Sequence, residues 1–330
     1  MDTRQLKYFV AIVECGSFAE ASRQLYIAQP ALSQQIARLE DEIGAPLLIR
    51  SAKGVSPTSN GFALFRHAKF VLRQLDHALT LARQPTAEIT GRVCLGIAPT
   101  TACQIGMPFL ERMQERYPGI LVNIVEGLSG HLQHMASNGE LDMAILFTNN
   151  AVVDWQCTPL LDEELFVILP AGSSLFQRNR DTITLAEIQE LPLFLPSKGH
   201  GLRRRIDIEF ERLDISLMPV SEIDSLPMLM GCLAQGLGAT IKPMSAINVH
   251  GTALAKNWRC LKISDAAISR TNYVFALPPQ RASDALMLAH RELLSLAHEH
   301  VSNGNWHGVE LISQSRARGL SAVAEVRKHA

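Results

Sequence analysis

The chain has 330 residues, enough for two or three domains, and its 47% hydrophobic and 19% charged residues indicate a globular protein with a substantial core. A formal net charge of −1 gives the whole chain no bias towards an oppositely charged partner. The first residues, MDTRQLKYF, lack the apolar core of a signal peptide, and no apolar run reaches transmembrane length. We therefore expect a cytoplasmic protein without membrane contact.

Residues 17–44 are predicted to form two short helices joined by a tight connection. Ser17 and Glu20 have the spacing of a capping box, in which each side chain accepts from the other residue's backbone N–H. Pro30 suits the first turn of the second helix, where its missing N–H would have no partner. Gly44 suits the end of that helix, because it tolerates a positive φ.

The second helix is predicted to be amphipathic. Its buried stripe consists of Leu32, Ile36, Leu39 and Ile43. The opposite face and the tip carry Gln29, Pro30, Ser33, Gln34 and Arg38. Ser and Gln can hydrogen-bond base edges, and small residues allow close approach to thymine methyl groups. We expect the first four of these residues to read bases from the first turns of a recognition helix, and Arg38 to hold a phosphate.

A basic hairpin is predicted to follow. The apolar run 47–49 suits a strand, 50–54 a basic turn, and Val55 begins a return. Arg50 and Lys53 are natural phosphate or minor-groove contacts, so the hairpin has the character of a wing. A helix pair with a solvated polar face also occurs in helical proteins that bind no DNA, and residues 1–61 hold six basic and six acidic residues, so the segment is no basic arm.

Residues 59–91 are predicted to form a long linker helix followed by a hinge-like break at 85–91. An a/d seam runs along the helix at Leu64, Ala68, Val71, Leu75, Ala78 and Ala82. We expect this seam to form a homodimer, which would present two DNA-reading heads to two half-sites. The alternative is an amphipathic helix that packs on its own domain.

The next 200 residues alternate between strand and helix patterns, which predicts a mostly parallel sheet covered by helices. The predicted strands are 92–98, 120–126, 141–147, 165–169, 193–195, 217–222, 239–241 and 272–277. The predicted helices are 101–117, 129–138, 202–213, 225–235 and 281–298. Two α/β units whose last elements return to the first would place a cleft between two lobes, lobe I (92–162 and 268–300) and lobe II (163–267).

Hydroxyl and basic side chains follow the carboxyl ends of these strands, where open α/β sheets bind ligands. They are Thr100, Thr101, Ser129, Ser197, Lys198, His200 and Ser225. Several of them open helices, whose N-termini offer free N–H groups and a positive dipole end. The set predicts a small anionic ligand, most simply a carboxylate. For each Ser or Thr taken singly, the alternative is ordinary N-capping.

Motifs of enzymes and metal proteins are not found in the sequence. There is no G-x-S-x-G, HExxH, Walker loop or GxGxxG, and the six cysteines lack CxxC or CxH spacing. We expect no catalysis, no cofactor, no metal site, and free, buried thiols. The remaining segment, 301–330, is predicted to be a solvated basic tail, with contact to DNA or RNA polymerase as the alternative.

Several ordered segments resemble the LysR-type transcriptional regulators. In the first 61 residues they are LKYF, GSFAEAS, QPALSQQIARLE, LLIR and GVSPTSNG, and farther on APTT, GELDMAIL, LPLFLPSKG, SEIDSL and QGLGATIKP. The resemblance covers about residues 1–300. The wording of IAQPALSQQ and PLLIRSAKGVSPT is most similar to the nitrogen-assimilation-control branch of that family.

The resemblance implies an α/β protein with a winged helix-turn-helix head (1–58), a linker helix and hinge (59–91), a two-lobed effector domain similar to periplasmic binding proteins (92–300) and a C-terminal tail (301–330). It implies double-stranded promoter DNA and a small-molecule effector as partners, and a homodimer that assembles into a homotetramer. In the family, the positions of Thr100, Thr101, Ser129 and Ser197 line the effector cleft, although the nitrogen-control branch leaves open whether a small ligand is needed. The rival interpretation is an α/β solute-binding or enzymatic protein with a helical protein-interaction head.

Overall fold

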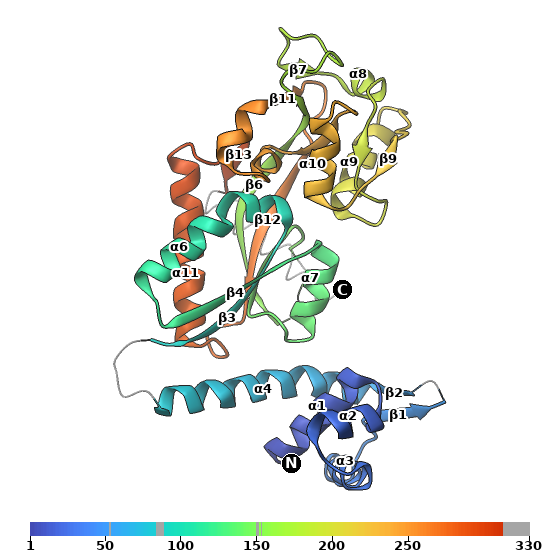
Figure 1. Ribbon diagram of the computed structural model, residues 1–330, viewed down its shortest axis with the longest axis vertical. Coiled ribbons are helices and arrows are strands. Elements are labelled where there is room, and N and C mark those ends of the chain that lie inside the picture. Colours follow the sequence, from blue (N-terminus) through green and yellow to red (C-terminus); the bar gives the residue numbers. More distant parts are fainter. Residues whose placement is uncertain (53, 84–88, 150–151, 153, 313–330) are drawn as a thin grey trace.

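The computed structural model describes residues 1–52, 54–83, 89–149, 152 and 154–312, which form a helical head, a long helix and a two-lobed α/β domain (Figure 1). The head contains α1 (Thr3–Cys15), α2 (Phe18–Leu25), α3 (Gln29–Ile43), β1 (Leu48–Ser51) and β2 (Gly54–Pro57). The two strands pair antiparallel, with Leu48 opposite Pro57, and confirm the predicted hairpin.

The predicted capping of α2 is half correct. The Ser17 side chain accepts from the Glu20 N–H at 3.4 Å, but Glu20 does not return the bond because its carboxylate pairs with Arg23. Helix α2 ends at Tyr26, whose φ of 54° lies in the left-handed region. Gly44 ends α3 in the same region, at φ 74°.

The buried stripe of α3 is shorter than predicted. Leu32, Ile36 and Leu39 are fully buried, whereas Ile43 is 40% exposed. The helix stops at the next residue, and Leu47 and Leu48 of the following segment enter the core in its place. The Glu40 carboxylate fixes that turn by accepting from the N–H groups of both leucines, at 2.7 and 3.1 Å.

Helix α4 (Ser59–Arg83) is the long linker helix, and it begins inside the head. Phe65 and Ala68 are buried in the head core, and Leu64 and Leu72 pack against it. Val71, just before Leu72, is 42% exposed, and Leu79, about two turns farther along, is 48% exposed. The first part of the predicted seam therefore packs on its own domain, while an apolar face remains open towards the end of the helix.

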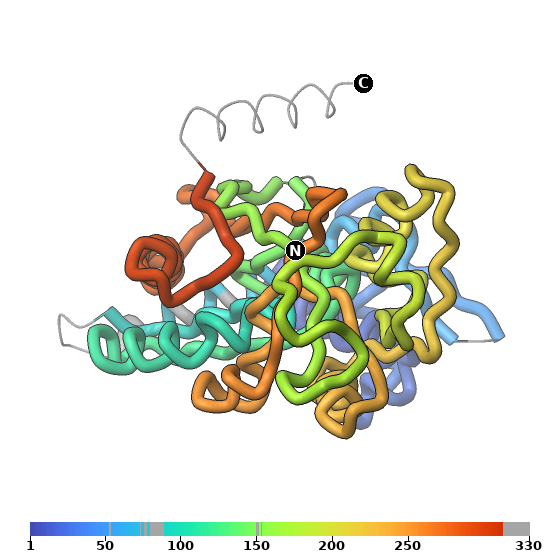
Figure 2. The backbone as a smooth tube through the Cα atoms, turned by 90° about the horizontal axis from the view of Figure 1, so that it is seen from above, coloured from blue at the N-terminus to red at the C-terminus, as the bar shows by residue number. Residues whose placement is uncertain are grey.

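Lobe I is built on a sheet with helices on both sides. Its first strands are β3 (Gly91–Ile97), β4 (Ile120–Glu126) and β5 (Met143–Leu146), and its helices are α5 (Pro99–Thr101), the π-helical η1 (Ala102–Gly106), α6 (Met107–Arg116), α7 (Ser129–Ser137) and α11 (Asp284–Ser302). Helices α6 and α11 lie side by side, joined by ion pairs from Arg112 to Glu299 and from Arg116 to Glu292 at 2.9 Å. Figure 2 shows α11 end-on beside α6.

Two longer strands change the expected character of the sheet. β6 (Gln156–Pro170) pairs antiparallel with β12 (Ser269–Ala276) through its first part and with β10 (Thr240–Pro243) and β11 (Trp258–Ile263) through its second. β12 also runs antiparallel to β5. The prediction of a mostly parallel sheet is therefore wrong. Among the described strands of this sheet, β3 runs parallel to β4 and β5, β11 runs parallel to the short β7 (Thr182–Ile183), and the other pairs are antiparallel. The returning chain must run against its neighbours to link the lobes.

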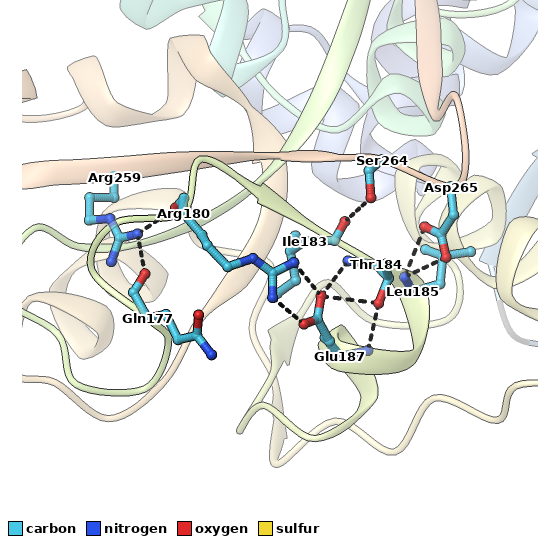
Figure 3. Close-up of polar contacts among 9 residues, drawn as sticks. All are labelled: Gln177, Arg180, Ile183, Thr184, Leu185, Glu187, Arg259, Ser264 and Asp265. Atoms are coloured by element: carbon cyan, nitrogen blue, oxygen red, sulfur yellow. Dashed lines mark hydrogen bonds and ion pairs between the residues drawn. The ribbon is translucent and has the colours of Figure 1, made fainter.

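Lobe II surrounds the second part of β6. Its remaining elements are α8 (Leu185–Gln189), β8 (Phe194–Leu195), α9 (Gly201–Glu211), β9 (Ser221–Glu222), α10 (Leu226–Ala234) and the 3-10 helices η2 (Met244–Asn248) and η3 (Thr252–Asn257). Figure 3 shows the polar contacts that fix the short β7–α8 segment, where Arg180 pairs with Glu187 and the Asp265 carboxylate accepts from the Leu185 N–H at 3.0 Å.

Part of the predicted tail is built into lobe I. Trp306 is 2% exposed, and β13 (Val309–Leu311) pairs antiparallel with β6. Residues 301–312 thus do not form a solvated tail, because their apolar side chains cover the sheet. Residues 313–330, on which the remaining tail prediction depends, lie outside the described residues.

All six cysteines carry free thiols, and only Cys94 is buried, while the others are half-buried. In the part of the chain that the structure describes, no helix is long and apolar enough to cross a membrane, and no cluster of three His, Cys, Asp or Glu side chains could hold a metal ion.

Candidate nucleic-acid interface and interlobe pocket

The outer face of α3 presents the residues predicted to read bases. Gln29, Pro30, Gln34 and Arg38 are exposed, and Ser33 is half-buried beside them. Ala28 occupies the N-cap and forms no side-chain bond, so the first N–H groups of α3 lack a side-chain cap. A helix end of this kind can bind a phosphate, which would seat the helix against a nucleic-acid backbone.

The wing and the turn add further polar groups around α3. Arg50 lies on β1 rather than in the predicted turn, is exposed, and has its guanidinium carbon 4.2 Å from the centre of the Phe18 ring. Lys53 lies outside the described residues. Sequence reasoning missed Tyr26, which is 96% exposed in the turn before α3. The sequence signal for its exposure was its position in the short turn between two predicted amphipathic helices.

One lysine connects the head, the linker helix and lobe I. The Lys69 ammonium on α4 lies 2.8 Å from a Glu14 carboxylate oxygen on α1 and 3.8 Å from one of Glu140, which follows α7. Nearby, the Arg281 guanidinium lies 4.8 Å from the centre of the Phe70 ring. These contacts join lobe I directly to α4 and the helical head.

A pocket lies between the two lobes and encloses about 360 Å³, its open mouth included. Its lining comes from the strand ends and helix starts of both lobes: Ala98, Pro99, Thr100, Leu128, Ser129, Phe147, His200, Asp224, Leu226, Lys242 and Arg270. The mixture of hydroxyl, charged and apolar side chains in this lining provides groups that can orient a small molecule.

Arg270 is held firmly in the wall of this pocket. Its guanidinium bonds to the Glu163 carboxylate at 2.8 Å through Nε and to the Thr100 hydroxyl at 2.7 Å, and it lies 3.8 Å from the centre of the Phe147 ring. Glu163 is fully buried and also accepts from the Ser245 hydroxyl at 3.0 Å. The charge of Arg270 is therefore neutralised within the protein.

Two further titratable groups line the pocket. Burial, together with the nearby Lys242 and Arg270 charges, lowers the pKa of His200 to about 4, and its Nδ1 accepts from the Leu202 N–H at 3.0 Å. Burial beside Arg270 lowers the pKa of Lys242 to about 7. His200 is thus neutral near pH 7. Lys242 is only partly protonated at this pH, so a nearby charge can change its protonation state.

Three of the seven predicted effector residues, Thr100, Ser129 and His200, come together at this pocket. The other four do not line it. The Thr101 hydroxyl faces Asn272 at 3.5 Å, and Ser197 bonds to Asp224. Lys198 is exposed, and Ser225 caps α10 by accepting from the Met228 N–H at 3.4 Å.

The charged lining residues Asp224, Lys242 and Arg270 were missed by the strand-end rule. Lys242 and Arg270 lie within strands, so that rule could not select them. The available signal was a basic residue in each of the apolar segments TIKP and SRTNYVFA.

The chain matches two family models. The model described as "Bacterial regulatory helix-turn-helix protein, lysR family" matches residues 3–62, and the "LysR substrate binding domain" matches residues 86–299. Among curated proteins, the nitrogen assimilation regulatory protein Nac of Klebsiella aerogenes is 37% identical over 251 residues, which cover 74% of this chain and 79% of that protein. Nac of Escherichia coli strain K12 is 36% identical over 247 residues, with the same coverage.

Solved structures share the fold. Full-length OxyR from Pseudomonas aeruginosa superposes with a TM-score of 0.66 at 24% identity, over 90% of this chain and 95% of that one. ArgP from Mycobacterium tuberculosis gives a TM-score of 0.70 at 19% identity, over 90% and 97% of the two chains. CbnR, solved in complex with its target DNA, gives 0.52 at 18% identity, over 90% and 100%.

Proposed function

The chain belongs to the LysR family and is a DNA-binding transcriptional regulator with an effector-binding domain, not an enzyme, and we propose that binding of a small anionic effector changes its affinity for promoter DNA in the cytoplasm. The observation that carries the proposal is the pairing, in one chain, of an exposed α3 face with a cation-lined pocket between the lobes.

In this proposal α3 enters the major groove. Gln29, Pro30, Ser33 and Gln34 face the base edges, because they occupy its first turns and outer face. Arg38 and the wing residues Arg50 and Lys53 contact phosphates, which position the head without selecting a sequence.

Dimerisation through α4 supplies the second head. The side chains of Val71 and Leu79 are exposed on α4, and they would be covered by the same helix of another copy. Two such dimers would form the homotetramer. The connection through Lys69 then offers a route by which a movement of lobe I reaches both heads.

In this proposal the effector changes the relative populations of two arrangements of the DNA-binding heads. A ligand can favour one arrangement of the heads only if it binds that arrangement more tightly than the other. The lining of the interlobe pocket comes from both lobes, so the affinity of the pocket for a ligand depends on how far apart the lobes lie.

Binding of the full chain to the DNA upstream of its own gene, followed by fluorescence anisotropy at several salt concentrations, tests the DNA-binding part. We expect Ser33→Ala and Gln34→Ala to change the preference among operator variants, because each removes a base-edge partner. Arg50→Ala should instead weaken binding to every sequence and reduce the salt slope by about 1, as expected for one lost phosphate contact.

Arg212→Ala is a matched control, because Arg212 is an exposed arginine on lobe II that pairs only with Glu209 among the described residues. Equal loss on all sequences for the Ser33 and Gln34 variants would remove these residues from base readout. An unchanged salt slope for Arg50→Ala would remove Arg50 from phosphate contact.

A further inference from the structure

Lys242 is a buried cation without a bonded counter-charge. It lies on β10, is 5% exposed and lines the interlobe pocket. Among the described residues, its ammonium group has no hydrogen bond and no ion pair. Arg270, the neighbouring cation, has both Glu163 and Thr100 as partners. The pocket wall therefore carries one positive charge that the protein itself leaves unmatched.

The charged and titratable groups around Lys242 come from four elements. Arg270 of β12 repels it, and Glu163 of β6 is already engaged by Arg270 and Ser245. Among the described residues, Asp224, before α10, is the neighbour that attracts Lys242. Its carboxylate accepts from the backbone N–H and the hydroxyl of Ser197, both at 2.9 Å, and it is exposed to solvent. His200, at the start of α9, is neutral near pH 7.

Groups suited to an anion stand on the lobe I side of the same pocket. Ser129 is the first residue of α7, whose N-cap Leu128 provides no side-chain hydrogen bond, so the first N–H groups of this nine-residue helix have no side-chain cap. The Thr100 hydroxyl accepts from Arg270 and keeps its own proton to donate. An anion held by these donors and by Lys242 would join lobe I to lobe II.

We propose that Lys242 holds the anionic group of the effector and that this group is a single carboxylate. This inference rests on the proposed function of an effector-regulated DNA-binding protein. One unmatched positive charge is neutralised by a carboxylate, whereas a phosphate or a dicarboxylate would leave negative charge buried.

The proposal gives the ligand affinity a defined pH dependence. In the empty pocket Lys242 loses its proton as the pH rises through about 7, because burial beside Arg270 disfavours the ammonium form. A bound carboxylate favours the ammonium form and raises that pKa. Affinity should therefore be constant below about pH 7 and fall about tenfold per pH unit above it, until the pKa of the complex is reached.

Calorimetric titration of the full chain with acetate, pyruvate, benzoate, succinate and inorganic phosphate, in two buffers of different ionisation enthalpy, tests these statements. We expect the monocarboxylates to bind more tightly than succinate or phosphate, with net proton uptake above about pH 7. Lys242→Met should abolish binding and remain folded, because it replaces an unpaired buried charge by an apolar side chain. Lys242→Arg should bind without this pH dependence, since arginine stays charged.

Lys262→Met is the matched control, because Lys262 lies on the lobe II strand β11, which like β10 pairs with β6, and because it is exposed and pairs with Glu164 at 3.0 Å. Unchanged binding in Lys242→Met, a flat pH profile, tighter binding of phosphate or succinate, or no binding of any monocarboxylate would overturn the inference. DNA anisotropy separates the two levels: if a ligand still alters DNA affinity in Lys242→Met, the inference fails and the proposed function stands. If bound ligand changes DNA affinity in no variant at any pH, the proposed function fails.

Discussion

The buried pair of Glu163 and Arg270 shows how single residues organise the junction of the lobes. Both side chains are almost completely inaccessible, and the carboxylate also accepts from Ser245 on η2. Removal of ions from water is unfavourable, so such a pair persists only where its remaining hydrogen-bonding groups are also satisfied. Thr100 and Ser245 meet that requirement and link the pair to both lobes.

The first prediction concerns Glu163→Gln. The substitution leaves the Arg270 charge buried without its counter-charge, so the free energy of unfolding should fall by about 3–5 kcal/mol. Urea denaturation followed by circular dichroism measures this loss. Glu164→Gln is the adjacent control: Glu164 is 31% exposed and pairs with the exposed Lys262, and it should change stability by less than about 1 kcal/mol. Equal losses in the two variants would contradict the importance assigned to the buried pair.

At the scale of elements, the head depends on a close approach between α4 and β1. A Cβ added at Gly61 would lie 1.9 Å from the backbone oxygen of Leu47. The same turn is fixed by the Thr58 hydroxyl, which accepts from the Gly61 N–H at 2.9 Å and donates to the Pro46 carbonyl at 2.8 Å. The absence of a side chain at this position lets the wing lie against the start of the linker helix.

Gly61→Ala should therefore destabilise the head, although alanine is the better helix former. We expect a loss of about 1–3 kcal/mol from overpacking, together with weaker DNA binding because the wing is displaced. Gly231→Ala is the control, since Gly231 lies inside α10 and an added Cβ would meet no atom within 4 Å. That change should stabilise the protein by about 0.5–1 kcal/mol. Thermal denaturation of both variants distinguishes a steric effect from helix propensity.

The elements differ in how far the sequence predicted them. The head helices and the wing were predictable, because capping residues, Gly44 and the helical spacing all indicate the same local structure. Strand β6 was predicted only at 165–169, because a strand buried by different neighbours along its length has no single alternation. The residues that line the pocket also differ in how predictable they were. Thr100, Ser129 and His200 lie at strand ends or helix starts and were predicted, whereas Lys242 and Arg270 lie within strands and are recognisable only once the strand pairing is known.

The whole molecule consists of three packed units, the head and the two lobes, that contact one another. The head has its own core, which includes the start of α4, and lobes I and II have separate cores. Lobes I and II are linked by the interlobe strands and by the Asn248 side-chain amide on η2, which donates to the Gln104 amide oxygen on η1 at 2.9 Å. The head contacts lobe I through Lys69 and Phe70 of α4.

The prediction at this scale is that α4 forms the dimer. Val71→Asp should raise the dimer dissociation constant by about thirtyfold or more, because it places a charge in a buried apolar contact worth about 2 kcal/mol. Analytical ultracentrifugation measures the change. Leu254→Asp, at a similarly exposed apolar residue of lobe II, should leave the dissociation constant unchanged. A dimer that tolerates aspartate at Val71 would place the interface elsewhere.

The unbroken course of β6 has a mechanical consequence. This strand leaves lobe I and enters lobe II without a loop, and it is hydrogen-bonded to neighbours along both parts. Any rotation of one lobe against the other must bend a paired ribbon, whose resistance grows with the angle. Such a joint is elastic rather than freely swivelling, so we expect any tilt of one lobe against the other to be small and reversible, with an amplitude set by the stiffness of the paired strands.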